Sequence, residues 1–124
     1  MKVLALDYGS ARTGIAVSDP TGTVARPLGI ARAVRTAAGF DGLLATIRAE
    51  EPERVVVGLP LTLRGARGSQ ARETLRFVDL LRGAVAVPVE TYDERFTSSL
   101  AGGDDAKAAA YILSSYLEWR QATR

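Results

Sequence analysis

Histidine and cysteine are both absent from this chain of 124 residues. Their absence excludes an imidazole base, a thiolate nucleophile and a zinc site built on nitrogen or sulfur ligands. Hydrolytic chemistry would therefore depend on carboxylates, on lysine or tyrosine, or on metal ions bound through oxygen. Among metal ions, Mg2+ and Mn2+ suit clustered Asp and Glu side chains best.

Long apolar runs are also lacking, since no stretch approaches the roughly 20 residues that span a bilayer. The opening MKVLALDYG has no secretory signal pattern, and the lack of cysteine is compatible with a reducing compartment. We therefore expect a cytoplasmic protein with no membrane partner. A composition of 47% hydrophobic and 24% charged residues predicts one folded domain over residues 1–124.

Lysine is scarce, with 2 residues against 14 arginines, although the net charge is only +2. Guanidinium groups suit phosphate, while a genome that favours arginine codons would explain the bias equally well. Residues 64–82 carry five arginines and two acids, a local net charge of +3. This excess favours an electrostatic footprint for nucleic acid.

Hydrophobic periodicity predicts an α/β fold with the element order βββαβαβα. The predicted strands are 2–8, 14–18, 24–30, 53–58 and 85–92, and the predicted helices are 37–51, 69–82 and 105–121. Short connections make the first three strands an antiparallel meander, and the continuously apolar ERVVVG at 53–58 indicates a buried parallel strand. The result is a mixed five-stranded sheet flanked by helices.

Helical spacing also predicts which side chains the last two helices bury. In the helix at 69–82 we expect Ser69 as the N-cap. The residues expected to be buried are Leu75, Val78 and Leu81 in that helix, and Ala108, Ala109, Ile112, Tyr116 and Trp119 in the helix at 105–121.

Four carboxylates stand where strands end or the last helix begins: Asp7, Asp93, Glu94 and Asp105. Ligands of such sheets gather beyond the carboxyl ends of parallel strands, so we expect these acids to converge as catalytic groups and metal ligands. Two ions held roughly 3.5–4 Å apart would suit phosphodiester hydrolysis. Because side chains alternate along a strand, only one of Asp93 and Glu94 should face Asp7, and the sequence leaves open which.

Each acid also has a purely structural interpretation. Asp7 could accept backbone N–H bonds in the turn that follows it, and Asp105 could serve as a helix cap. The acids of the DER triplet could form a surface ion pair with Arg95.

Five segments, taken together and in order, are similar to the YqgF/RuvX family. They are LALDYGSARTGIAVSD at 4–19, RPLGI at 26–30, VVVGLPLTLRG at 55–65 followed by Gln70, DERFTS at 93–98, and Asp-x-x-Ala-Ala at 105–109 running into ILSSYLE. The resemblance implies an RNase H-like fold and a metal-dependent nuclease that processes pre-16S rRNA, related to Holliday-junction resolvases. This sequence departs from the family pattern between Leu100 and Asp105, where members of the family carry a longer, often basic insert.

Candidate nucleic-acid contacts surround the acids, namely Arg12, Arg64, Arg67, Arg95, Thr97 and Ser98. The expected partner is structured RNA, specifically pre-rRNA, with branched DNA as the alternative, and the expected state is a monomer or a weak homodimer. A junction resolvase would need a self-complementary apolar patch, for which Tyr116 and Trp119 are the candidates. Two other classes stay open: a non-catalytic RNA-binding ribosome assembly factor, and a nucleotide-dependent phosphotransferase suggested by DYGSARTG.

The shortened connection predicts that phosphate binding depends on Arg64, Arg67 and Arg95. Replacing Arg64 and Arg67 together with Ala should weaken binding of unrelated RNA sequences about equally. It should also reduce the slope of log affinity against log salt by roughly one to two, because fewer counterions are released. Titrations of two unrelated RNAs at several salt concentrations measure both effects, and an unchanged affinity and slope would show that this loop is ordinary solvated surface.

Overall fold

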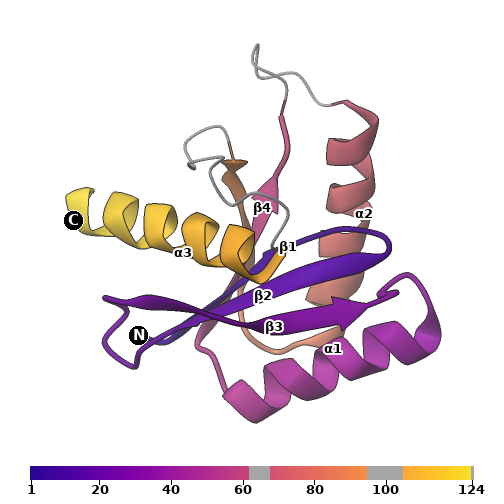
Figure 1. The fold of residues 1–124 in the computed structure, drawn as a ribbon, viewed down its shortest axis with the longest axis horizontal. Coiled ribbons are helices and arrows are strands. Elements are labelled where there is room, and N and C mark those ends of the chain that lie inside the picture. The colour runs from indigo at the N-terminus through magenta and orange to yellow at the C-terminus, as the bar shows by residue number, and fades with distance from the viewer. Residues whose placement is uncertain (62–67, 95–104, 124) are drawn as a thin grey trace.

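A computed structural model describes residues 1–61, 68–94 and 105–123, and their elements follow the order βββαβαβα (Figure 1). The strands are β1 (Val3–Asp7), β2 (Arg12–Ser18), β3 (Ala25–Arg32), β4 (Arg54–Leu59) and β5 (Val89–Asp93), and the helices are α1 (Ala37–Glu50), α2 (Ser69–Ala84) and α3 (Asp105–Ala122). The predicted element order is confirmed.

The strands form one five-stranded sheet in the order β3-β2-β1-β4-β5. Strand β1 lies at its centre, antiparallel to β2 and parallel to β4, and β4 is parallel to β5. The short turn after Asp7 allows only an antiparallel neighbour, whereas α1 and α2 each provide a crossover long enough for a parallel one. The sheet is therefore mixed, as predicted.

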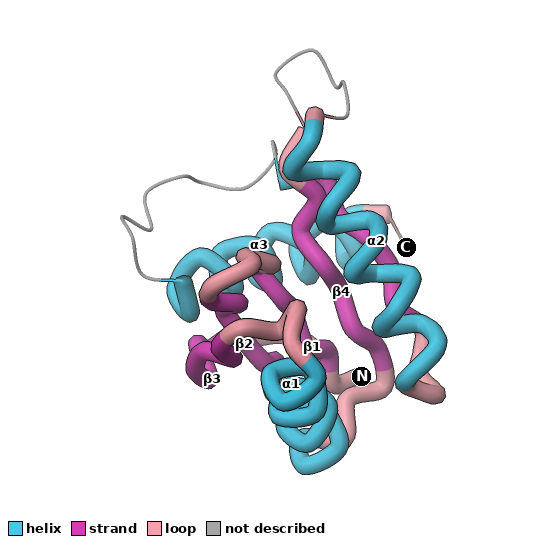
Figure 2. The backbone as a smooth tube through the Cα atoms, turned by 90° about the vertical axis from the view of Figure 1, so that its right-hand side faces the viewer, coloured by secondary structure: helices cyan, strands magenta, loops and turns pink. Residues whose placement is uncertain are grey.

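Helices cover both faces of the sheet, with α3 on one side and α1 and α2 on the other (Figure 2). Along β1, Leu4 and Leu6 belong to the core shared with α1 and α2, while Val3 and Ala5 pack with α3. Because both faces are covered, β1 is apolar at every position before Asp7. Among the described helices, none has the length and apolar character needed to cross a membrane.

Two glycines allow α3 to approach the sheet closely. A Cβ atom at Gly14 in β2 would lie 1.9 Å from the backbone carbonyl oxygen of Asp105, the first residue of α3. In β4, a Cβ at Gly58 would lie 2.7 Å from Cδ1 of Ile112. A side chain at Gly14 would push the start of α3 away from the sheet, whereas one at Gly58 would displace the side chains of Glu94 and Ile112.

Two predicted details of α2 are wrong. The N-cap is Gly68, which offers no side-chain cap, and Ser69 is the first helical residue. Leu75 is only half-buried, whereas Phe77 is buried in its place, with Val78 and Leu81 buried as predicted. The buried stripe of the helix is set by how α2 lies on the sheet, which the apolar spacing alone does not fix.

The limits of β5 and the buried face of α3 also differ from the prediction. Strand β5 begins at Val89 rather than at residue 85, because Val85 is the C-cap of α2. In α3 the buried residues include Leu113 and Leu117, and Trp119 is 51% exposed. On each turn of α3 two adjacent residues face the sheet, such as Ile112 with Leu113 and Tyr116 with Leu117. Trp119 lies at the edge of this buried face and is therefore partly exposed.

A comparison of two glycine substitutions tests the close approach of α3. Gly14→Ala should lower the free energy of unfolding by about 1–3 kcal/mol, the usual cost of overpacking, because backbone atoms must move. Gly42→Ala, in the exposed middle of α1 with nothing within 4 Å of the added carbon, should raise it by about 0.5–1 kcal/mol. Urea unfolding of both variants measures the difference, and equal stabilities would contradict the tight contact at Gly14.

Candidate active site

Asp7 lies at the carboxyl end of the central strand, on the face covered by α3. It continues the alternate set of Val3 and Ala5, which pack against that helix, and it pairs in register with Gly14. On the other side Leu6 pairs with Val57, which places Gly58 beside Asp7. The half-buried carboxylate of Asp7 therefore lies between two glycines. Because glycine has no side chain, there is room beside Asp7 for groups from other elements.

Glu94 approaches Asp7 from the end of β5. Its side chain crosses Gly58, where a Cβ would lie 2.5 Å from Oε1 of Glu94, and its carboxyl hydrogen-bonds the carboxylate of Asp7. Asp93, one residue earlier, belongs to the alternate set with Val89 and pairs with Leu59 of β4. Of the two acids between which the sequence does not decide, Glu94 is therefore the one that faces Asp7. The negative charge of Asp93 contributes to raising the pKa of Glu94.

The Asp7–Glu94 pair shares one proton. Burial, the charge of Asp7, the hydrogen bond to Asp7 and the charge of Asp93 together raise the pKa of Glu94 to about 7. Burial is also the main cause that raises the pKa of Asp7, with a smaller contribution from the charge of Asp105, while the hydrogen bond from Glu94 lowers it. Below neutral pH the proton therefore lies on Glu94, which donates a hydrogen bond to the Asp7 carboxylate.

Asp105 occupies the first turn of α3, where the helix dipole favours a negative charge. Its Oδ2 atom lies 3.3 Å from Nε of Arg12 at the start of β2. The Arg12 side chain is 55% exposed, so this ion pair is weak and Arg12 can turn to another anion. The sequence leaves open on which side Arg12 lies, and the structure places it beside Asp105. Asp105 is the first residue of α3 rather than the residue before it, so its role there is a favourable charge at the helix start.

A cleft of about 390 Å3 opens next to Asp105, between the first turns of α2 and α3. Its lining consists of Tyr8, Gly9, Ser10, Ala11, Arg12, Gln70, Glu73 and Asp105. Tyr8 donates a hydrogen bond of 3.1 Å to Oε1 of Glu73, and burial followed by this bond raises the pKa of Tyr8. Gln70 and Glu73 were not among the predicted site residues; the family-like segment that ends in Gln70 is the signal that could have indicated Gln70.

The described residues do not hold a complete metal cage. Within 1–61, 68–94 and 105–123, no three Asp, Glu, His or Cys side chains are arranged so that they could hold an ion. The structure joins Asp7 to Glu94 and brings the charge of Asp105 to bear on Asp7, but these acids do not form a three-ligand group. Five predicted contact residues lie outside the described part of the chain, namely Arg64, Arg67, Arg95, Thr97 and Ser98.

The fold and the strand-end carboxylates define an RNase H-like α/β domain. A Thermus thermophilus RuvC structure, solved in complex with a Holliday junction substrate, matches with a TM-score of 0.63 at 19% identity, covering 99% of this chain and 97% of the other. The fowlpox virus Holliday junction resolvase matches with a TM-score of 0.58 at 13% identity, covering 96% and 99%. At these identities the likeness establishes the fold alone.

Sequence comparison gives the family. The RuvX family model, described as "Holliday junction resolvase", matches residues 1–119. A protein of Anaeromyxobacter sp. named "Putative pre-16S rRNA nuclease" is 38% identical over 98% of this chain and 100% of its own length. A protein of the same name from Chloroflexus aurantiacus is 39% identical over 97% and 88%. The chain belongs to the RuvX family.

The shared proton predicts how stability depends on pH without metal. The pKa of Glu94 is higher in the folded state, at about 7, than its ordinary value of 4.5, so folding favours the protonated form. The contribution of protonated Glu94 to the free energy of unfolding is fully present below pH 4.5 and is lost as the pH rises to about 7. Because the chain lacks histidine, few other groups titrate near neutrality.

Glu94→Gln should therefore flatten this decline and be more stable than the wild type at pH 8. Urea unfolding in EDTA between pH 4 and pH 8 measures both profiles. Parallel profiles for the two proteins would show that Glu94 titrates normally.

Proposed function

We propose that this chain is a metal-dependent nuclease that hydrolyses phosphodiester bonds in structured RNA, and that its substrate is the 5' end of pre-16S rRNA. The observation that carries the proposal is the pair of proton-sharing carboxylates, Asp7 and Glu94, at the carboxyl end of the central strand. The names of the full-length relatives support the substrate, and the RNase H-like fold supports the chemistry.

The donor set fits Mg2+ or Mn2+, because every candidate ligand is a carboxylate oxygen. The proton between Asp7 and Glu94 already offsets part of their repulsion, which is the role that a divalent cation fills between two carboxylates. Asp7 and Glu94 would hold the metal together with oxygens of water or substrate, while Asp105 and Asp93 would add negative charge on either side of the pair. When bound, two such ions supply activation of the attacking water and charge neutralisation at the leaving oxygen.

The residues around these acids have roles that follow from their positions. Glu94 gives up its proton when its carboxylate is needed as a ligand, so metal affinity should rise with pH. Arg12 is exposed and only weakly held by Asp105, and it can orient a phosphate at the cleft. We include Arg64, Arg67, Arg95, Thr97 and Ser98 as further proposed phosphate contacts.

Cleavage of branched DNA is the second candidate, because the matching family model is described as a Holliday junction resolvase. The apolar patch proposed for a resolvase dimer is reduced, since Tyr116 is 1% exposed and only Trp119 is left of that pair. A non-catalytic assembly factor is disfavoured by the half-buried, hydrogen-bonded pair of acids, which a binding protein does not need. The proposed location is the cytoplasm, where ribosomal RNA is processed.

Asp7→Asn tests the proposal directly. The variant should lose metal-dependent cleavage of structured RNA while folding with unchanged or slightly greater stability in EDTA, because one charge leaves a crowded cluster. The assay compares structured RNA with a four-way DNA junction in Mn2+, Mg2+ or EDTA. The matched control is Asp41→Asn, an exposed acid on α1.

If Asp7→Asn cuts at the wild-type rate, Asp7 is structural and the carboxylate mechanism is wrong. If the wild type cuts only the DNA junction, the resolvase function replaces the RNA-processing function. Binding of RNA without cleavage under any metal condition would favour the assembly factor.

A further inference from the structure

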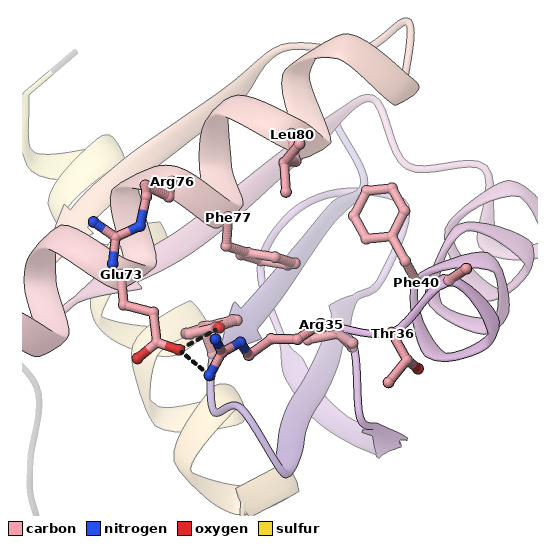
Figure 3. A pocket seen from close by; sticks show the side chains of 10 residues that line it. Arg35, Thr36, Phe40, Glu73, Arg76, Phe77 and Leu80 are labelled. Carbon is pink, nitrogen blue, oxygen red and sulfur yellow. Dashed lines mark hydrogen bonds and ion pairs between the residues drawn. The ribbon is translucent and has the colours of Figure 1, made fainter.

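A second cavity lies on the face of the sheet opposite α3, between α1 and α2 (Figure 3). Its volume is about 560 Å3, within the roughly 300–1,000 Å3 range of ligand pockets. It is lined by Tyr8, Val34, Arg35, Thr36, Ala37, Phe40, Glu73, Arg76, Phe77 and Leu80. None of the roles described above for the acids uses this cavity.

Aromatic and aliphatic side chains form its inner wall. Phe77 stacks on Tyr8 with ring centroids 4.6 Å apart, and Phe40 meets Phe77 edge to face at 6.4 Å. Leu80 is 67% exposed, although it is a large apolar side chain facing the same cavity. Figure 3 shows Phe40 on the α1 side facing Phe77 and Leu80 on the α2 side. A flat apolar group would cover carbon surface that is now exposed to water.

Two arginines give the cavity a positive rim. The Arg35 side chain is 66% exposed, and its Nη1 atom lies 3.2 Å from Oε1 of Glu73, which also accepts the Tyr8 hydroxyl. Arg76 lines the cavity from α2, one turn after Glu73. The net charge of these three groups is positive, so the rim favours an anion. A flat apolar wall beside a cationic rim complements a nucleobase with its phosphate.

This cavity borders the cleft beside Asp105. Tyr8 and Glu73 line both the 560 Å3 cavity and the 390 Å3 cleft that contains Arg12 and Asp105. Tyr8 also follows Asp7 directly in the chain, with its side chain on the opposite face of the sheet. Because the two spaces share a wall, one strand of nucleic acid that places a phosphate at the cleft can place a neighbouring nucleotide in the α1–α2 cavity.

We propose that the α1–α2 cavity binds an unpaired nucleotide of the RNA substrate near the cleaved phosphate. The base packs against the half-buried Phe40 and the exposed Leu80, with the buried Phe77 behind them, and the phosphate lies near Arg35 and Arg76. The inference rests on the proposed function for its substrate class. It adds that the chain selects RNA with a bulged or single-stranded nucleotide over continuous duplex.

The test uses two RNA hairpins that differ only in one bulged 2-aminopurine, with the full chain and Ca2+ in place of Mg2+ to prevent cleavage. Wild type should bind the bulged hairpin more tightly, and the 2-aminopurine fluorescence should change as the base contacts aromatic rings. Phe40→Leu keeps an apolar side chain but removes the ring. It should lower the affinity ratio of bulged to paired RNA by about fivefold or more, as expected for a lost base–aromatic stack.

Arg76→Gln should weaken binding of the bulged hairpin and reduce the magnitude of its salt slope by about one. Its matched control is Arg48→Gln, an exposed arginine on α1 outside this cavity, which should keep the wild-type ratio. Circular dichroism and urea unfolding confirm that each variant is folded before binding is compared.

The results separate the two proposals. Equal affinity for both hairpins, or a bulge preference that survives Phe40→Leu with its fluorescence change, overturns the nucleotide site even if the wild type cleaves RNA. A bulge preference that depends on Phe40 and Arg76 supports the site even if no RNA is cleaved. Release of the bulged hairpin by low concentrations of free AMP would identify the cavity as a mononucleotide site and would also overturn the proposal.

Discussion

The close approach of α3 to the sheet is the constraint on which the candidate site depends. Gly14 and Gly58 flank Asp7 on the two neighbouring strands, and neither has a side chain that would hold the helix away. As a result, Asp105 arrives over β2 while Glu94 extends across β4. The acids come from the first strand, the end of the last strand and the last helix, yet they share one small region because two positions lack a Cβ.

This arrangement brings like charges together at a cost to the metal-free fold. Burial and repulsion raise the pKa of Glu94 to about 7, so below neutral pH the pair carries one negative charge rather than two. Arg12 offsets part of the charge of Asp105 from the surface. The fold therefore accommodates these carboxylates by protonating one of them and by pairing another with Arg12.

The order of elements and the mixed sheet follow from the sequence, because apolar runs and short turns fix them. The approximate position of the acids also follows, since strand ends and a helix start are visible as patterns. Other features depend on packing that spacing does not reveal. Examples are the choice of Glu94 over Asp93, the exposure of Trp119, and the buried Phe77 in place of Leu75. The α1–α2 cavity is another feature that the sequence does not reveal, because Arg35 and Glu73 are distant in sequence and form their ion pair only in the folded chain.

The central position of β1 has a further consequence for synthesis of the protein. Strand β1 pairs with β2 through a short turn, so the meander of β1, β2 and β3 can form as soon as it leaves the ribosome. The face that carries Asp7, however, stays uncovered until α3 has been made, because Val3 and Ala5 pack against that helix. In a nascent chain, Asp105 therefore acts on Asp7 only after α3 has been synthesised and has packed against the sheet.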